Sequence, residues 1–143
     1  MHLKFKRKKD GAIEVVAAVL IGTAIISTLF VYFVSNIPPV NTTYKAEAIA
    51  RKYMLKMEET GYLNIDNLNQ MTHAFKSIGV NNIDTAGTTL NKVQYGDDVY
   101  LTIKYKITFK KLTVKSGIIP AFSNKDETVT IKKSSTSKNT VEP

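Results

Sequence analysis

The stretch "VYLTIKYKITF", residues 99–109, decides the fold of this chain. Apolar and aromatic side chains alternate in it with polar and charged ones. The two sets are Val99, Leu101, Ile103, Tyr105, Ile107 and Phe109, against Tyr100, Thr102, Lys104, Lys106 and Thr108. A period of two residues predicts a long β-strand with one buried face and one solvated face. The sequence on either side must supply neighbouring strands and a layer that covers the buried face.

Two further strands are expected beside this one. A shorter strand is predicted within residues 90–95, followed by a tight hairpin turn at residues 96–97 that leads into the long strand. A third strand is predicted at residues 128–133. Together they would form a small antiparallel meander. Residues 134–143 are polar and lack apolar spacing, so they are predicted to be a disordered tail.

Two helices are expected to cover the apolar face of the meander. Residues 45–59 have helical periodicity, and Gly61 would end that helix. Its apolar face consists of Ala46, Ile49, Ala50, Tyr53, Met54 and Met57. A shorter helix would begin after Asn64, whose side chain can cap it, and would end at Gly79.

The N-terminal part contains a long apolar run, VVAAVLIGTAIISTLFVYFV, at residues 15–34. As a helix this run of 20 residues would be about 30 Å long, which matches the hydrocarbon core of a bilayer. We therefore predict an uncleaved transmembrane helix. Pro38-Pro39 would end this helix or bend the chain away from it, and residues 41–43 would cap the next helix.

A cluster of cations precedes the apolar run: Lys4, Lys6, Arg7, Lys8 and Lys9. The positive-inside rule places this end in the cytoplasm and the remainder outside the cytoplasmic membrane. The predicted fold class is thus α+β, with a single N-terminal transmembrane helix followed by two helices on a small antiparallel β-meander. The predicted parts are a basic cytoplasmic leader at 1–14, the membrane helix at 15–34, an extracytoplasmic domain at 35–133 and the tail at 134–143.

Composition excludes several kinds of chemistry. The 143 residues include no cysteine and two histidines, which leaves out a disulfide framework, a thiolate metal site and a cysteine nucleophile. Paired carboxylates suited to acid–base catalysis and phosphate-binding loops are also missing from the sequence. We therefore expect no enzyme activity, no catalytic residue, no cofactor and no bound metal. The net charge of +8 suits anionic lipid, nucleic acid or an acidic partner.

Glu14 stands at the start of the apolar run and has two interpretations. As a first-turn carboxylate it would interact favourably with the helix dipole while the headgroups still supply water. In an assembly of such helices it could instead neutralise the amino terminus of a neighbouring subunit. Ala18 and Gly22 form a small-xxx-small pair that would let another helix approach closely, although small residues are common in such helices.

The basic leader, Asp10-Gly11, Ala12-Ile13-Glu14 and the small-residue-rich apolar helix resemble the Flp-type and TadE-like pilins and pseudopilins. Those proteins are structural subunits of type IVc pili and related secretion machines. The resemblance implies a prepilin peptidase that cuts between Gly11 and Ala12. In such pilins the glutamate is typically the fifth residue after the cut. Here Glu14 would be third, whereas a cut after Lys9 would make it fifth but would lack the preceding glycine.

The stretches "MEETGYLNID", "SIGVNN" and "VQYGDDVYLTIKYKITF" are also similar to an uncharacterised family of single-span proteins from Gram-positive bacteria. Members of that family are encoded near conjugation or TadE-like genes. The resemblance implies a structural role and supplies no catalytic residues.

These patterns predict a pilin-like or pseudopilin-like subunit of a pilus, secretion or conjugation apparatus. Its partners would be the membrane, other such subunits and a prepilin peptidase. The alternative is an unprocessed, signal-anchored accessory protein with an extracytoplasmic binding domain. Lys104, Lys106 and Lys110 lie on one strand face and could contact an anionic partner. From Ser35 onward lysine and arginine exceed aspartate and glutamate, which leaves attraction to acidic wall polymers open. Membrane-tethered DNA binding is a weaker alternative to a solvated face, because too few aromatics accompany the lysines.

Overall fold

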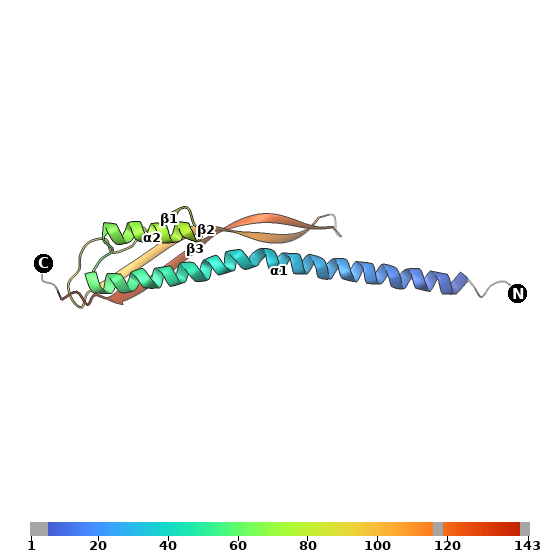
Figure 1. Cartoon of the computed structure of the whole chain (residues 1–143), viewed down its shortest axis with the longest axis horizontal. Helices are drawn as coiled ribbons and strands as arrows, with labels where there is room; N and C mark the ends of the chain where they lie inside the picture. Colours follow the sequence, from blue (N-terminus) through green and yellow to red (C-terminus); the bar gives the residue numbers. More distant parts are fainter. Residues whose placement is uncertain (1–5, 116–118, 141–143) are drawn as a thin grey trace. The chain divides into compact units, whose positions relative to one another are not determined.

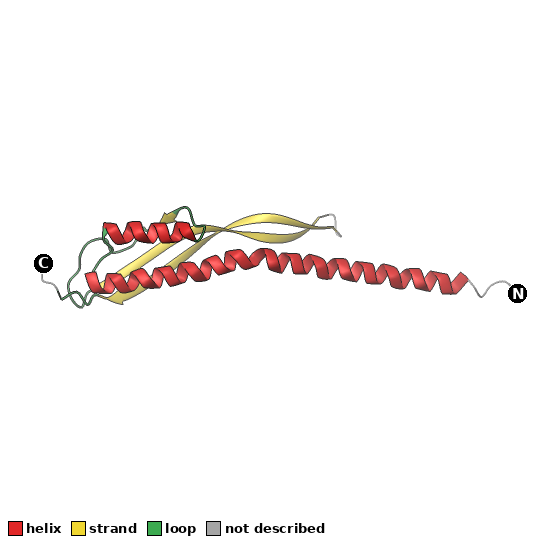
Figure 2. Cartoon of the chain, in the orientation of Figure 1, coloured by secondary structure: helices red, strands yellow, loops and turns green. Residues whose placement is uncertain are grey.

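A computed structural model describes residues 6–115 and 119–140 of the chain (Figure 1). The elements are α1 (Lys6–Thr60), α2 (Ile65–Ser77), β1 (Ile83–Asp84), β2 (Asp98–Lys115) and β3 (Ile119–Thr136). The strands form one antiparallel sheet in the order β1-β2-β3 (Figure 2). The predicted α+β class is confirmed, as is the presence of a long apolar N-terminal helix.

The chain divides into two compact units. The first contains the residues up to Asn36 together with Lys110–Ser123, and the second contains Ile37–Phe109 together with the residues from Asn124 onward. The helix α1 and the strands β2 and β3 each contribute to both units.

The hydrophobic core lies in the second unit, on one face of β2. The odd-numbered residues Val99 to Ile107 of β2 are all buried, as the alternating pattern predicts. Both helices supply buried residues to the same cluster: Ala46, Ala50, Tyr53, Met54 and Met57 from α1, and Met71 and Phe75 from α2. The rings of Phe75 and Tyr105 have centroids 5.9 Å apart. One sheet face is therefore covered by helices, and the even-numbered side chains of β2 remain on the other.

Both ends of α2 follow the sequence prediction. Asn64 is the N-cap, and its Oδ1 accepts a 2.8 Å hydrogen bond from the backbone N–H of Asn67. Gly79, at φ 88°, follows the C-cap. The N–H of Gly79 donates to the carbonyl of Lys76, and the N–H of Val80 donates to that of Phe75. These two bonds form a Schellman motif, which satisfies carbonyls that the helix end would leave free.

Of the two alternatives predicted at Pro38-Pro39, the end of the helix is wrong, because α1 is a single helix of 55 residues with both prolines inside it. The separate helix at 45–59 is the last part of α1. Proline fixes φ near −65°, which is a helical value, but each interior proline removes a backbone hydrogen bond and its ring crowds the carbonyl four residues earlier, at a cost of about 3 kcal/mol or more. Beyond them the hydroxyl of Thr43 donates to the carbonyl of Pro39. The buried face that begins at Ala46 then holds the rest of the helix in place.

The predicted short strand at residues 90–95 is also wrong, although Tyr95-Gly96 does form a turn. The partner of β2 is instead β1, where Ile83 pairs with Tyr105 and Asp84 with Lys104. Thr88 and Thr89 lie just before residues 90–95 and bond to the edge of β2 through their hydroxyls and through the backbone of Thr89. Because this edge is already occupied, residues 90–95 form no strand there.

The C-terminal region is more ordered than its composition suggests. The strand β3 begins well before the predicted 128–133 and ends at Thr136, so residues 134–140 do not follow the prediction of a disordered tail. The N–H of Ser137 donates to the carbonyl of Asp97 at 2.8 Å, and Ser137 and Asn139 are buried. Polarity alone misled the prediction, since the polar groups here are hydrogen-bonded within the fold. Residues 141–143 lie outside the described residues.

Candidate functional site

The first part of α1 is apolar and exposed. Its most apolar 18-residue window has a mean hydropathy of 2.3, and none of that window is buried. Large apolar side chains such as Ile26 and Phe30 are 69% and 68% exposed. This is the one helix in the described part of the chain that is long and apolar enough to cross a membrane.

The residues predicted for processing and assembly all lie in this part of α1. Gly11, Ala12, Glu14 and Ala18 are exposed, and Gly22 is half-buried. A Cβ atom added at Gly11 or Gly22 would meet nothing within 4 Å. A glycine inside a helix costs about 1 kcal/mol relative to alanine. Because neither Gly11 nor Gly22 is in close contact with other parts of the chain, packing within the chain does not explain these two glycines. Ala18 and Gly22 are four residues apart and share one helix face.

The three lysines predicted to meet an anionic partner all lie on β2. Lys104 and Lys106 line the same open pocket in the second unit. Lys110 belongs to the first unit, where its backbone N–H donates to Oδ1 of Asn36 at 3.0 Å and its carbonyl accepts from Nδ2 at 3.1 Å. The candidate site on the sheet therefore contains two of the three predicted lysines.

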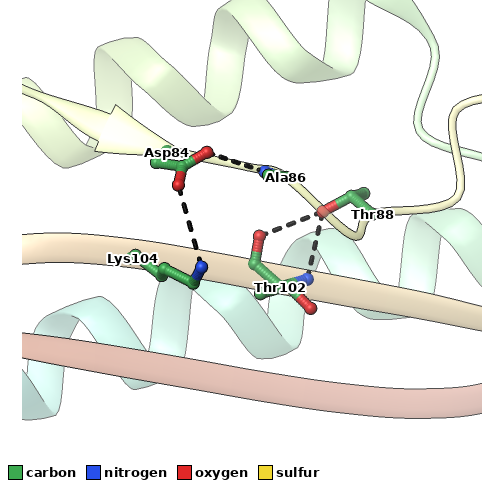
Figure 3. Close-up of polar contacts among 5 residues, drawn as sticks. All are labelled: Asp84, Ala86, Thr88, Thr102 and Lys104. Atoms are coloured by element: carbon green, nitrogen blue, oxygen red, sulfur yellow. Dashed lines mark hydrogen bonds and ion pairs between the residues drawn. The ribbon is translucent and has the colours of Figure 1, made fainter.

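Short-range polar contacts shape the sheet beside this pocket (Figure 3). Asp84 accepts a hydrogen bond from the N–H of Ala86 at 2.8 Å, which makes a local turn directly after β1. Its other carboxylate oxygen lies 4.0 Å from Nζ of Lys104. The hydroxyl of Thr88 accepts from the N–H of Thr102 and donates to its carbonyl, both at 3.0 Å. Next to β1, the Thr88 side chain thus bonds to the backbone of β2 where a neighbouring strand would otherwise pair.

The pocket has a volume of about 520 Å³ and is open to solvent. It is lined by Gly79, Asn81, Asn82, Ile83, Asp84, Lys104, Tyr105, Lys106 and Thr128. Burial raises the pKa of the Tyr105 hydroxyl, and this side chain belongs to the hydrophobic core. The sequence did not predict Asn81, Asn82 and Thr128 for this site. The β1–β2 register brings the two asparagines beside the lysines, and the pairing of β2 with β3 brings Thr128 there. The adjacent asparagines after the glycine that ends α2 were the one available signal.

A second polar cluster joins the end of α1 to the C-terminal segment. The carboxylate of Glu58 accepts hydrogen bonds from Nζ of Lys138 at 2.8 Å and from the hydroxyl of Ser135 at 2.7 Å. The backbone N–H of Lys138 also donates to the carbonyl of Glu58 at 2.6 Å. The bond from Lys138, followed by that from Ser135, lowers the pKa of Glu58 from its ordinary value of 4.5.

This lowered pKa gives a prediction for acid. A carboxyl group whose pKa is lower in the folded state stabilises the fold above its unfolded value, and loses that contribution as pH falls through the folded value. We expect Glu58→Gln to be destabilising near pH 6, with a difference from the unsubstituted chain that disappears as pH falls below 4.5. Urea unfolding at several pH values measures this difference. Glu59→Gln makes the same charge change on an exposed neighbour. A difference for Glu58→Gln that stays constant from pH 6 to pH 3 would contradict the prediction.

Within residues 6–115 and 119–140, no group of three or more histidine, aspartate or glutamate side chains is placed to hold a metal ion. His73 is an exposed residue of α2.

Comparison with known proteins gives no match to this chain among protein-family models, curated proteins or solved structures.

Proposed function

We propose that this chain is a single-pass protein of the cytoplasmic membrane and a pilin-like or pseudopilin-like structural subunit of a pilus, secretion or conjugation apparatus. One observation carries the proposal: a single helix is apolar and largely exposed over residues 15–34, whereas one face of its last part, from Ala46 to Met57, is buried in the core of a folded unit. Such a helix provides both an apolar segment that could anchor the chain and a face that packs in an α+β domain.

The exposed apolar side chains support membrane insertion. Transfer of apolar surface out of water is favourable by roughly 25 cal/mol per Å², and a helix satisfies its own backbone hydrogen bonds inside lipid. The basic residues before the apolar run favour a cytoplasmic N-terminus and an extracytoplasmic C-terminal domain.

Assembly would use the small-residue face of the helix. Ala18 and Gly22 would let the backbone of a neighbouring helix approach closely. Gly22 has open space around it within its own chain, which leaves room for such a neighbour. Glu14, at the exposed start of the apolar run, would neutralise the amino terminus that a prepilin peptidase creates on a neighbour.

The second candidate function is an unprocessed, signal-anchored accessory protein, and the spacing between Gly11 and Glu14 favours it. Mass spectrometry of the N-terminal peptide from the native membrane separates the two. A mature chain that starts at Ala12 or Asp10 supports the pilin-like subunit. An intact leader, in cells with an active prepilin peptidase, supports the plain anchor.

Assembly through the small-residue face makes a prediction about cross-linking. The chain contains no cysteine, so single-cysteine variants can be made directly. We expect Ala18→Cys and Gly22→Cys to form disulfide-linked dimers on mild oxidation in native membranes. Ala24→Cys, on the opposite face of the helix, is the matched control and should cross-link several-fold less. Equal cross-linking at all three positions would argue against a specific helix–helix contact.

A further inference from the structure

The open pocket beside β1 exists because β1 is very short. The ladder with β2 contains two residue pairs, and the chain from Gly79 to Asn82 leaves the sheet before it. The space between this segment and Lys106 is the pocket, and Thr128 of β3 lines it as well. Its volume of about 520 Å³ lies within the range of about 300–1,000 Å³ that is usual for small-molecule sites.

The charges around this pocket favour an anion. Lys104 faces one carboxylate oxygen, that of Asp84, at the long distance of 4.0 Å, and both side chains are about half exposed. Lys106 forms no ion pair with any residue that the structure describes. Two lysines and one aspartate therefore leave an excess positive charge, and the ammonium group of Lys106 is available to a ligand.

Neutral hydrogen-bonding groups surround these charges. Asn81, Asn82 and Thr128 are exposed, and within the described residues none of their side chains bonds to another residue. Amides and hydroxyls both donate and accept, so they suit the hydroxyl groups of a sugar or polyol. A base-stacking surface is missing from the lining, because its one aromatic residue, Tyr105, is 2% exposed. Nucleic acid of the kind that stacks on aromatic rings therefore fits this pocket poorly.

We propose that this pocket binds a phosphate group carried on a polyol or sugar, with Lys106 and Lys104 on the phosphate and with Asn81, Asn82 and Thr128 on the hydroxyls. The ligand can come from a soluble or wall-bound polyol phosphate or from the headgroup of a glycerol phospholipid. These sources share the same chemistry, and the experiment below distinguishes them.

The test uses the full chain in zwitterionic micelles, titrated with a glycerol phosphate oligomer and followed by calorimetry. We expect Lys106→Gln to weaken binding by about tenfold or more, as loss of a charge-assisted hydrogen bond would. Lys132→Gln, an exposed lysine of β3 outside the pocket, removes the same charge and should change the affinity by less than about twofold. A parallel titration into nanodiscs with and without phosphatidylglycerol identifies a lipid source, since occupied pockets would no longer take up the oligomer.

Several results would overturn the proposal. Equal losses for Lys106→Gln and Lys132→Gln would show general charge attraction. If inorganic phosphate bound as tightly as the glycerol phosphate oligomer, the polyol hydroxyls would not contribute to binding, and the proposed ligand class would be wrong. A single-stranded oligonucleotide of equal charge that binds more tightly, and depends on Lys106, would assign the pocket to nucleic acid.

Discussion

Replacement of Phe75 by alanine is expected to lower the free energy of unfolding of the second unit by about 3–5 kcal/mol. The Phe75 side chain of α2 is fully buried in the hydrophobic core, and its ring packs on that of Tyr105. Removing it takes away a large apolar surface and leaves a cavity whose surroundings relax only in part. Loss of this magnitude is comparable to the whole stability of many small domains.

Urea unfolding of the full chain in micelles, followed by hydrogen exchange of the β2 amides, measures this effect. Ile65→Ala is the control, because Ile65 is a large apolar residue of the same helix α2 but is 75% exposed. We expect it to change the free energy by no more than about 0.5 kcal/mol. Similar losses for both variants would mean that the ring of Phe75 does not fill the core.

The second large effect is expected at Gly61, where alanine should cost about 2–5 kcal/mol. Two causes add at this position. The backbone has φ 80°, which L side chains rarely adopt, and a Cβ atom would lie 2.7 Å from the carbonyl oxygen of Val93 and 3.2 Å from the hydroxyl of Ser137. The carbonyl belongs to the backbone, and the N–H of Val93 also donates to Gly61, so this contact cannot relax by turning a side chain.

Gly79→Ala separates the two causes. Gly79 has a similar φ of 88°, but a Cβ atom there would meet nothing within 4 Å. It should cost only the conformational part, about 1–2 kcal/mol. The same unfolding measurement compares the two variants. If Gly61→Ala were no worse than Gly79→Ala, the close approach of residue 93 to the end of α1 would be disproved.

Local patterns predicted the parts of the fold that depend on neighbours in sequence. The alternation from Val99 to Ile107 identified the buried face of β2, and the Asn64 and Gly79 signals identified both ends of α2. These features succeed because a strand face, an N-cap and a glycine C-terminus are each decided within a few residues.

Features that depend on distant residues could not be read in the same way. The continuity of α1 through Pro38-Pro39 rests on packing that begins beyond them. The order of residues 134–140 rests on partners such as Glu58 and Asp97, far away in the sequence. The pocket could not be predicted from the sequence, because it depends on the β1–β2 register, which brings the Asn81-Asn82 pair beside Lys106. Lys110 shares the even-numbered face of β2 with Lys106 but does not line the pocket.

The pairing of Thr88 and Thr89 with β2 also bears on aggregation. An open strand edge is a template for another chain, and copies of this protein would meet repeatedly in the plane of a membrane if it is anchored there as proposed. Here the N–H and carbonyl of Thr102 are both engaged by the hydroxyl of Thr88, and those of Tyr100 are engaged by the hydroxyl and N–H of Thr89. Two threonine hydroxyls and one backbone N–H thus protect this stretch of sheet edge against uncontrolled association, with no additional strand.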